Sequence, residues 1–320
     1  MKKLLSTLYL ALLAPLALAQ TAAVTCPDKN LLYWQAFPPG GESDLSARHQ
    51  QVVLKKKCPA IDTIVQYKAG AGGGLMWSQM NSLPGDGVNV VGINLPHIVF
   101  QPLEGQVQYK TQDITPVFWF HYTPDILVVP EQSPIKTFAD FIKAAKAEPG
   151  KLSLGGSGLN SANHAAHERM NAAFGVKTIY IPYKGTGDMA TAVLGAQVDG
   201  AMTYSPFAIS NKGRVRPLAV AMEKRHPLLP DVPTFKELGL EPVNRMAYYG
   251  IVGPKGLPKE VVDKVSAGVK KSLEDPAVRK RIEDTGSLVV ANTPEQFAAQ
   301  IKAEYEVYRK VVESAKLKLD

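Results

Sequence analysis

The sequence predicts an α/β protein with two domains and a ligand cleft between them. Four β-rich runs each lead into a glycine-rich turn that precedes a helix, and strands that alternate with helices form parallel sheets. Two of these turns fall in each half of the chain, around Gly40, Gly70, Gly155 and Gly185. Because ligands bind beyond the carboxyl ends of parallel strands, we expect the four turns to meet at one cleft.

The first half of the chain contains two of these units. A strand is predicted from Leu31 to Phe37 and leads into the turn FPPGGESD at 37–44. Its glycines allow close backbone approach, Ser43 or Asp44 can cap the next helix, and the free N–H groups of a helix start attract anions. The second predicted strand, 63–67, leads into GAGGG at 70–74.

The second half repeats the arrangement. Predicted strands at 151–154 and 178–183 lead into GGSG at 155–158 and GTGD at 185–188. Between the two pairs, 113–117 and 125–130 are predicted strands, and the second is placed to cross between domains. Thr137 is predicted to cap a helix that ends before Pro149, and 215–220 is a predicted returning strand.

The tail is predicted to be helical. Val261, Val265 and Val269 share one helical face, Asp275 begins a short helix, and TPEQ at 293–296 is a capping box. We expect this tail to pack on the first domain and make it discontinuous. The predicted division is 20–123 with 222–320 for domain 1, and 124–221 for domain 2. Crossings near 124 and 222 are typical of a hinged clamshell.

The N-terminus is typical of a secretory signal peptide over residues 1–19. Lys2 and Lys3 precede an apolar run from Leu4 to Leu18, which is shorter than the roughly 20 residues of a membrane-spanning helix and so disfavours an anchor. Without the two lysines, the net charge falls from +7 to +5. Basic residues are spread out and not interleaved with aromatic ones, which argues against a nucleic-acid partner.

Export to an oxidising compartment favours a disulfide between the two cysteines, Cys26 and Cys58. This bond would tie the segment before the first strand to the end of the first helix. The alternative is two unpaired small residues, and two cysteines this far apart do not form a metal motif.

Patterns typical of enzymes are incomplete. GTGDMA at 185–190 fits a dinucleotide fingerprint, but no acidic residue ends a second strand about 20 residues later. GGSGL at 155–159 lacks the last glycine of a nucleophile elbow. We therefore expect no cofactor.

Side-chain clusters with catalytic or metal-binding potential are equally incomplete. His164, His167 and Glu168 match neither of the two common zinc motifs, so no metal site is expected. Glu42 and Asp44 lie on the same side of one turn and cannot flank a scissile bond. An enzyme is therefore not expected, and an α/β enzyme acting on a carboxylate is kept as an alternative.

A set of short motifs resembles the solute-binding proteins of tripartite tricarboxylate transporters, the Bug family. The motifs occur in family order over nearly all of the mature chain. They are PGG at 39–41 with Asp44 and Ala47-Arg48, AGAGG at 69–73, PGDG at 84–87, GSG at 156–158 with His164, IPYKG at 181–185, RPLAV at 216–220 and LPDVPT at 229–234.

The resemblance implies a type II periplasmic-binding-protein fold that closes on its ligand. It further implies a periplasmic protein that binds a small carboxylate, possible classes being dicarboxylates and aromatic acids, and delivers it to membrane transporter subunits. We expect a monomer. A receptor that hands its liganded form to a membrane sensor is an alternative that the sequence does not separate from transport.

The resemblance also implies ligand contacts through backbone N–H groups and hydroxyls, with Ser157 as a hydrogen-bond donor. By matching position these contacts are Pro39, Gly40, Gly41, Ser43, Asp44, Ala71, Gly72, Ser157, Gly158, Asn160, Ser161, Tyr183, Gly185 and Thr186. From their own positions beside predicted turns, Phe37, Tyr204 and Ser205 are expected to complete the pocket.

Glu42 departs from the family pattern, in which a small or neutral residue is expected. Its carboxylate can turn to solvent, or it can accept a hydrogen bond from a hydroxyl, an amine or a protonated acid on the ligand. We expect it to face solvent, and we expect Asp44 to secure the turn and the helix start.

Overall fold

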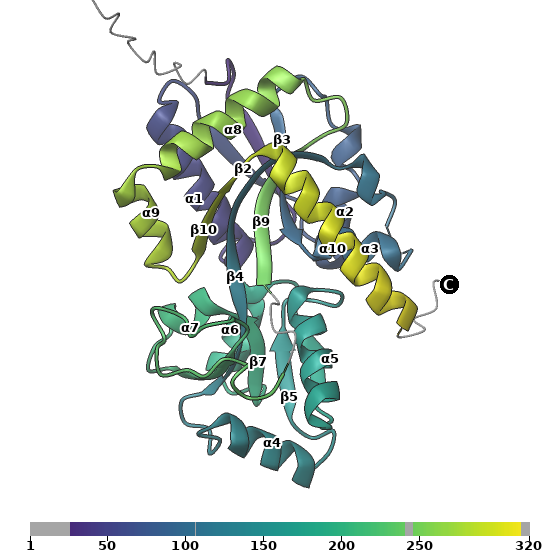
Figure 1. Ribbon diagram of the computed structural model, residues 1–320, viewed down its shortest axis with the longest axis vertical. Coiled ribbons are helices and arrows are strands. Elements are labelled where there is room, and N and C mark those ends of the chain that lie inside the picture. The colour runs from purple at the N-terminus through teal and green to yellow at the C-terminus, as the bar shows by residue number, and fades with distance from the viewer. Residues whose placement is uncertain (1–25, 106, 241–245, 315–320) are drawn as a thin grey trace, which may run out of the picture.

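The computed structural model describes residues 26–105, 107–240 and 246–314, so the predicted signal peptide lies outside the described residues. Two lobes are joined by the long strand β4, Thr115–Pro130, which runs from the upper lobe into the lower one (Figure 1). The predicted strands at 113–117 and 125–130 both fall on this one strand, except that the first was predicted to begin two residues before Thr115. Strands follow each other in the order β2-β1-β3-β9-β4-β7-β5-β6, while β8 and β10 also pair with β4.

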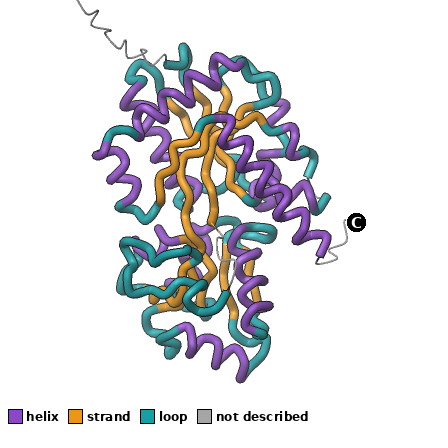
Figure 2. Tube along the Cα trace, in the orientation of Figure 1, coloured by secondary structure: helices purple, strands orange, loops and turns teal. Residues whose placement is uncertain are grey.

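The upper lobe is a mixed sheet with helices on both faces (Figure 2). Strand β1 is parallel to β2 and β3, and β9 is antiparallel to β3 and β4. The strands, besides the first part of β4, are β1 Leu31–Gln35, β2 Thr63–Tyr67, β3 Asn89–Leu95, β9 Met246–Gly253 and β10 Leu288–Asn292.

Two hydrophobic cores fill the two faces of this sheet. One core joins the sheet to α1 Glu42–Lys57, α8 Lys259–Leu273 and α9 Pro276–Glu283. The other core joins it to α2 Gly74–Trp77, α3 His97–Leu103 and α10 Pro294–Ser314. The helical tail therefore packs on the upper lobe, as the sequence predicts.

The lower lobe repeats this layering on a smaller scale. Strand β5 is parallel to β6 and β7, whereas β7 and β8 are antiparallel to the second part of β4. The strands are β5 Ser153–Gly156, β6 Ile179–Pro182, β7 Gly200–Tyr204 and β8 Val215–Val220. The helices are α4 Phe138–Ala147, α5 Ala162–Phe174, α6 Thr186–Leu194 and α7 Ser205–Ser210.

The chain passes between the lobes at two places. In β4, Pro124 still pairs with Met246 in the upper sheet, whereas Asp125 pairs with Tyr204 in the lower one. The predicted return near residue 222 is too early. Phe235 packs in the lower core with Phe138, with ring centroids 5.8 Å apart, and Leu240 packs against the same core. The return therefore follows Leu240, because residues 222–240 cover apolar surface of the lower lobe.

Three of the predicted helix starts are confirmed. Thr137 caps α4 by accepting a hydrogen bond from Asp140 N, and Asp275 caps α9. Thr293 and Gln296 form the predicted capping box at the start of α10, with Gln296 N donating to Thr293 Oγ1 and Thr293 N to Gln296 Oε1. Each of these caps satisfies N–H groups that a helix start leaves free.

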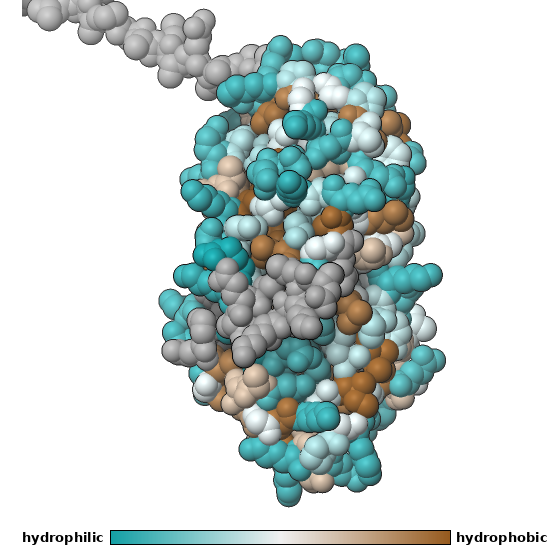
Figure 3. Space-filling view, turned by 90° about the vertical axis from the view of Figure 1, so that its right-hand side faces the viewer, coloured by the Kyte–Doolittle hydropathy of each residue, from teal (hydrophilic) through white to brown (hydrophobic). Residues whose placement is uncertain are grey.

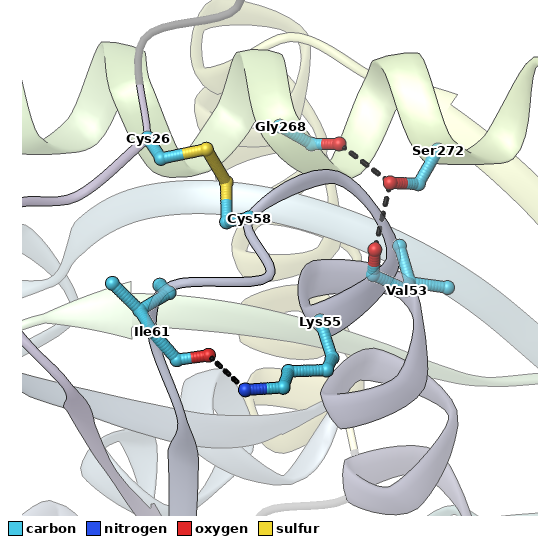
Figure 4. Close-up of a disulfide and its surroundings, with 7 residues drawn as sticks. All are labelled: Cys26, Val53, Lys55, Cys58, Ile61, Gly268 and Ser272. Atoms are coloured by element: carbon cyan, nitrogen blue, oxygen red, sulfur yellow. Dashed lines mark hydrogen bonds between the residues drawn. A yellow bond between two sulfur atoms is a disulfide. The ribbon is translucent and has the colours of Figure 1, made fainter.

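Cys26 and Cys58 form a disulfide that ties the segment before β1 to the end of α1 (Figure 4). This is the pairing that the sequence predicts. The bond lies where α1 meets α8, and Ser272 of α8 donates a hydrogen bond to Val53 O at 2.7 Å in the same region. This hydrogen bond thus holds the end of α1 against the helical tail, while the disulfide fixes the same end to the segment before β1.

Hydrophilic residues cover most of the face that Figure 3 shows, and the hydrophobic ones are scattered over it in small groups. No helix within the described residues is both long enough and apolar enough to cross a membrane.

Candidate functional site

A cavity of about 310 Å³ lies between the lobes, where the turns after β1 and β6 face each other. This volume lies in the range of small-molecule sites. The lining residues that the sequence predicts are Phe37, Pro39, Gly40, Gly41, Glu42, Ser43, Ser157, Gly185, Thr186 and Tyr204. The turns of the two halves thus meet in one cleft.

The first turns of α1 and α6 are in direct contact across this cleft. Gly41 precedes α1, Gly185 precedes α6, and Glu42 N donates a hydrogen bond to Thr186 Oγ1 at 2.7 Å. A Cβ atom on Gly41 would lie 2.9 Å from the same oxygen. Since Gly41 has a φ of −95°, this position requires glycine for close approach and not for backbone freedom.

The helix start differs from the prediction that Ser43 or Asp44 caps it. Glycine 41 is the N-cap and neither side chain caps the helix. Asp44 instead accepts hydrogen bonds from Gly40 N at 2.9 Å and from the hydroxyl of Tyr67 at 2.7 Å. Its carboxylate secures the turn, as expected, but it does not line the cavity. Ser43 does, and its Oγ accepts a hydrogen bond from Asn94.

Glu42 is buried, so the expectation that it faces solvent is wrong. Its exposed fraction is 7%, and it lines the cavity as the first residue of α1, the end of the helix that meets the lower lobe. Its Oε1 atom is buried without a hydrogen-bond partner among the described residues. Burial raises the pKa of the carboxyl from the usual 4.5 to about 8, because a charge is poorly solvated there.

The lower wall of the cavity is a buried hydrogen-bonded chain. Asn163 donates to Asp125 at 2.6 Å and accepts the hydroxyl proton of Ser157 at 2.7 Å, and Tyr204 lies 3.3 Å from the Ser157 oxygen. A hydroxyl has one proton to donate. Ser157 therefore lines the cavity with its proton directed to Asn163, and its role as a donor to a ligand stays a prediction.

Sequence reasoning missed five lining residues: Pro38, Asn94, His97, Gly187 and Asp188. Asn94 and His97 lie at the carboxyl end of β3, which lacks the glycine-rich turn used to find the other walls. The available signal was the position of β3 itself, since it is parallel to β1 and ends at the same edge.

His97 has an unusual environment for a polar side chain. It is 1% exposed, neither ring nitrogen has a hydrogen-bond partner among the described residues, and the ring packs edge-on against Phe37 and Trp77. Burial lowers its pKa to about 3, so the imidazole is neutral at pH 7. It therefore supplies no positive charge to the cavity.

Several predicted residues lie outside this cavity. Ala71, Gly72, Asn160 and Tyr183 line a separate cavity of about 350 Å³. Ser161 caps α5 and donates to Gly158 O, so both belong to the turn before that helix. Ser205 donates to Gly286 O at 2.9 Å and links the lobes away from the cavity.

A further cavity of about 490 Å³ adjoins the contact between Gly41 and Thr186 and shares Glu42 and Tyr204 with the first. Mostly apolar residues of α6 and α7 line it, together with Asp284 and Thr285. Glu42 therefore stands between two cavities of the same cleft.

Metal-binding potential is low in the part of the chain that the structure describes. No three or more His, Cys, Asp or Glu side chains there are grouped so that they could hold a metal ion. Glu168 contacts His167 at 2.9 Å, and the two histidines of α5 find no further acidic or sulfur ligand.

Comparison with protein families matches residues 47–317 to the model described as "Tripartite tricarboxylate transporter family receptor". A curated relative, the "UPF0065 protein in tcbD-tcbE intergenic region" of Pseudomonas sp. (strain P51), is 30% identical over 314 residues, which cover 94% of this chain and 92% of the relative. Protein BugT of Bordetella pertussis is 27% identical, with 94% of each chain covered.

Solved structures give the same result. "Structure of a periplasmic transporter" has a TM-score of 0.86 and 31% identity, covering 92% of this chain and 99% of that one. The periplasmic binding protein BugD has a TM-score of 0.85 and 26% identity, with 91% and 99% covered. MatC from Rhodopseudomonas palustris, with bound malate, has a TM-score of 0.82 and 26% identity, with 89% and 99% covered.

Proposed function

Since the chain belongs to the tripartite tricarboxylate transporter receptor family, with the periplasmic-binding-protein fold that its motifs predict, we propose that it captures a small carboxylate between its lobes and delivers it to a membrane transporter. The observation that carries this proposal is the meeting of two helix starts, from opposite lobes, at one cavity. The first N–H groups of a helix have no partner within the helix and favour an anion. A ligand held by both starts stabilises the closed arrangement of the lobes.

The chemistry of the lining supports a ligand held by backbone donors. No lysine or arginine lines the 310 Å³ cavity among the described residues, so the helix starts are the positive groups available there. MatC, a structural neighbour at 26% identity, has malate bound, and malate is a small carboxylate. A cavity of this size holds a molecule of that class.

We further propose that the two lobes move as domains. One comprises residues from the mature N-terminus to 123 together with the tail, and the other runs from 124 to about 240. Strand β4 is the connection among the described residues on which closure turns. Residues 1–19 would be removed on export to the periplasm, where the protein acts as a monomer.

Binding without chemical conversion is part of the proposal. The family and the structural neighbours are binding proteins. Incubating the protein with each bound carboxylate and analysing the mixture by mass spectrometry should return the ligand unchanged. A product that forms with the protein and not without it would favour the enzyme alternative.

A thermal-shift screen of small mono- and dicarboxylates tests the main proposal. At a ligand concentration of 100 times Kd, binding stabilises the folded state by about 2.7 kcal/mol. For a chain of this size that corresponds to an increase in Tm of roughly 5 °C. We expect at least one acid to give such a shift, and no shift with any acid would contradict carboxylate capture.

A further inference from the structure

The carboxyl group of Glu42 is a buried group that the carboxylate-binding role does not use. It is 7% exposed and lines both cavities of the cleft, and its Oε1 atom has no hydrogen-bond partner among the described residues. A buried carboxyl without a partner is costly unless a ligand supplies one. Its position at the start of α1 puts it beside the N–H groups that favour the ligand carboxylate.

No lysine or arginine of the described residues lines the cavities beside this group. Among the described residues, neither cavity is lined by lysine or arginine, and the charged side chains they contain besides Glu42 are Asp188 from α6 and Asp284 from the end of α9. His97 from α3 is neutral at pH 7, because burial lowers its pKa. Burial raises the pKa values of the Tyr204 and Tyr249 hydroxyls, so these groups are uncharged as well. In the part of the chain that the structure describes, the cleft therefore has an acidic group without a counter-ion beside the N–H groups that favour an anion.

We propose that the ligand carries an ammonium group beside its carboxylate and that Glu42 binds this ammonium as a carboxylate. The ligand class is then an amino acid in the wide sense. Its carboxylate would face the N–H groups of the first turn of α1, and its ammonium would face the carboxylate of Glu42. This inference rests on the proposed capture of a carboxylate and narrows its ligand.

A dicarboxylate fits these surroundings less well. Its second negative charge would enter a cavity that already contains Asp188 and Glu42 and has no basic side chain among the described residues. It would be accommodated if Glu42 kept its proton and donated it to the ligand. The two ligand classes therefore differ in proton balance, because an ammonium displaces the proton of Glu42 whereas a second carboxylate retains it.

Calorimetry on matched pairs of acids tests the inference. The pairs are aspartate and succinate, glutamate and glutarate, phenylalanine and 3-phenylpropionate, and 4-aminobutyrate and butyrate. We expect at least one amino member to bind at least about tenfold more tightly than its partner, as a close charge pair implies. With the pKa of Glu42 near 8, binding of the amino member at pH 7 should release about 0.9 proton from Glu42. Calorimetry in buffers of different ionisation enthalpy measures this release.

Variants identify the residue responsible. Glu42→Gln keeps the size of the side chain and removes its charge, so the ratio between the affinities of the amino member and its desamino partner should fall by about tenfold or more. Glu260→Gln is the matched control, because Glu260 lies in the first turn of α8 and is exposed. It should leave the preference unchanged. The proton release of the unmodified protein is a readout that does not depend on either variant folding.

The outcomes separate this inference from the proposed function. Binding of the desamino acids as tightly as their amino partners, binding without proton release, or an unchanged preference in Glu42→Gln would overturn the ammonium site and leave carboxylate capture intact. Binding of none of the four amino members would overturn the ammonium site, whereas carboxylate capture is overturned only if no acid of the thermal-shift screen binds either.

Discussion

Replacing Gly41 by alanine should keep the lobes from closing to the distance seen in the structure. The new Cβ atom would lie 2.9 Å from Thr186 Oγ1 and 3.3 Å from Gly187 N. Both atoms belong to the opposite lobe and to the first turn of α6. One is backbone and the other is the hydroxyl of a β-branched side chain, which has little freedom to turn away. The lobes must therefore separate by a few tenths of an ångström, which lengthens and weakens the hydrogen bond from Glu42 N to Thr186 Oγ1.

The loss can be estimated from two contributions. A hydrogen bond is worth about 0.5 to 1.5 kcal/mol, and inserting a methyl group into a filled contact costs about 1 to 3 kcal/mol. The closed, liganded state should lose about 2 to 4 kcal/mol, which is roughly a 30- to 1,000-fold loss of affinity. The open protein has no such contact, so its free energy of unfolding should fall by only about 1 kcal/mol, for the poorer N-cap.

Isothermal calorimetry with a carboxylate from the screen measures the affinity, and small-angle scattering measures the contraction on binding. Gly187→Ala is the comparison, since its Cβ atom would meet Gly40 at an ordinary 3.5 Å and the affinity should fall by about tenfold or less. If Gly41→Ala binds and contracts like the unmodified protein, the contact between α1 and α6 does not limit closure.

Three further results are expected. Thr186→Val leaves the N–H of Glu42 unpaired and should weaken ligand binding by about 1 to 2 kcal/mol with an unchanged circular dichroism spectrum; equal affinity by calorimetry would discount that hydrogen bond. Because the folded-state pKa of Glu42 is raised from 4.5 to about 8, the protein should lose stability as pH rises through this window, and Glu42→Gln should not. In urea unfolding, the free energy of unfolding of Glu42→Gln should exceed that of the unmodified protein by about 5 kcal/mol at most, and this difference should level off above pH 8. A difference that does not change with pH would contradict the burial of Glu42. Reducing the Cys26–Cys58 bond, at a sequence separation of 32, should lower the free energy of unfolding by about 3 to 4 kcal/mol, and equal urea midpoints would refute this.

Strands, glycine turns and most helix caps were predictable because their signals are local, although the cap expected from Ser43 or Asp44 is not formed. A β-rich run that ends in GG or GTGD specifies its own turn, and Thr137, Asp275 and Thr293 cap helices through neighbours within three residues. The second turn shows the limit of this reasoning. Ala71 and Gly72 occur in a turn like the other three but line a different cavity, because the position of a turn along the cleft depends on the order of strands in the sheet.

By itself, the sequence determined the two α/β lobes, the family and the corner FPPGGESD as a wall of the cleft. The tertiary structure alone decided that Glu42 is buried there. A glutamate in a turn is expected to face water, and Glu42 is buried where the start of α1 meets the start of α6 from the other lobe. These two segments lie 144 residues apart in the sequence, so their contact is set by packing and not by local preference.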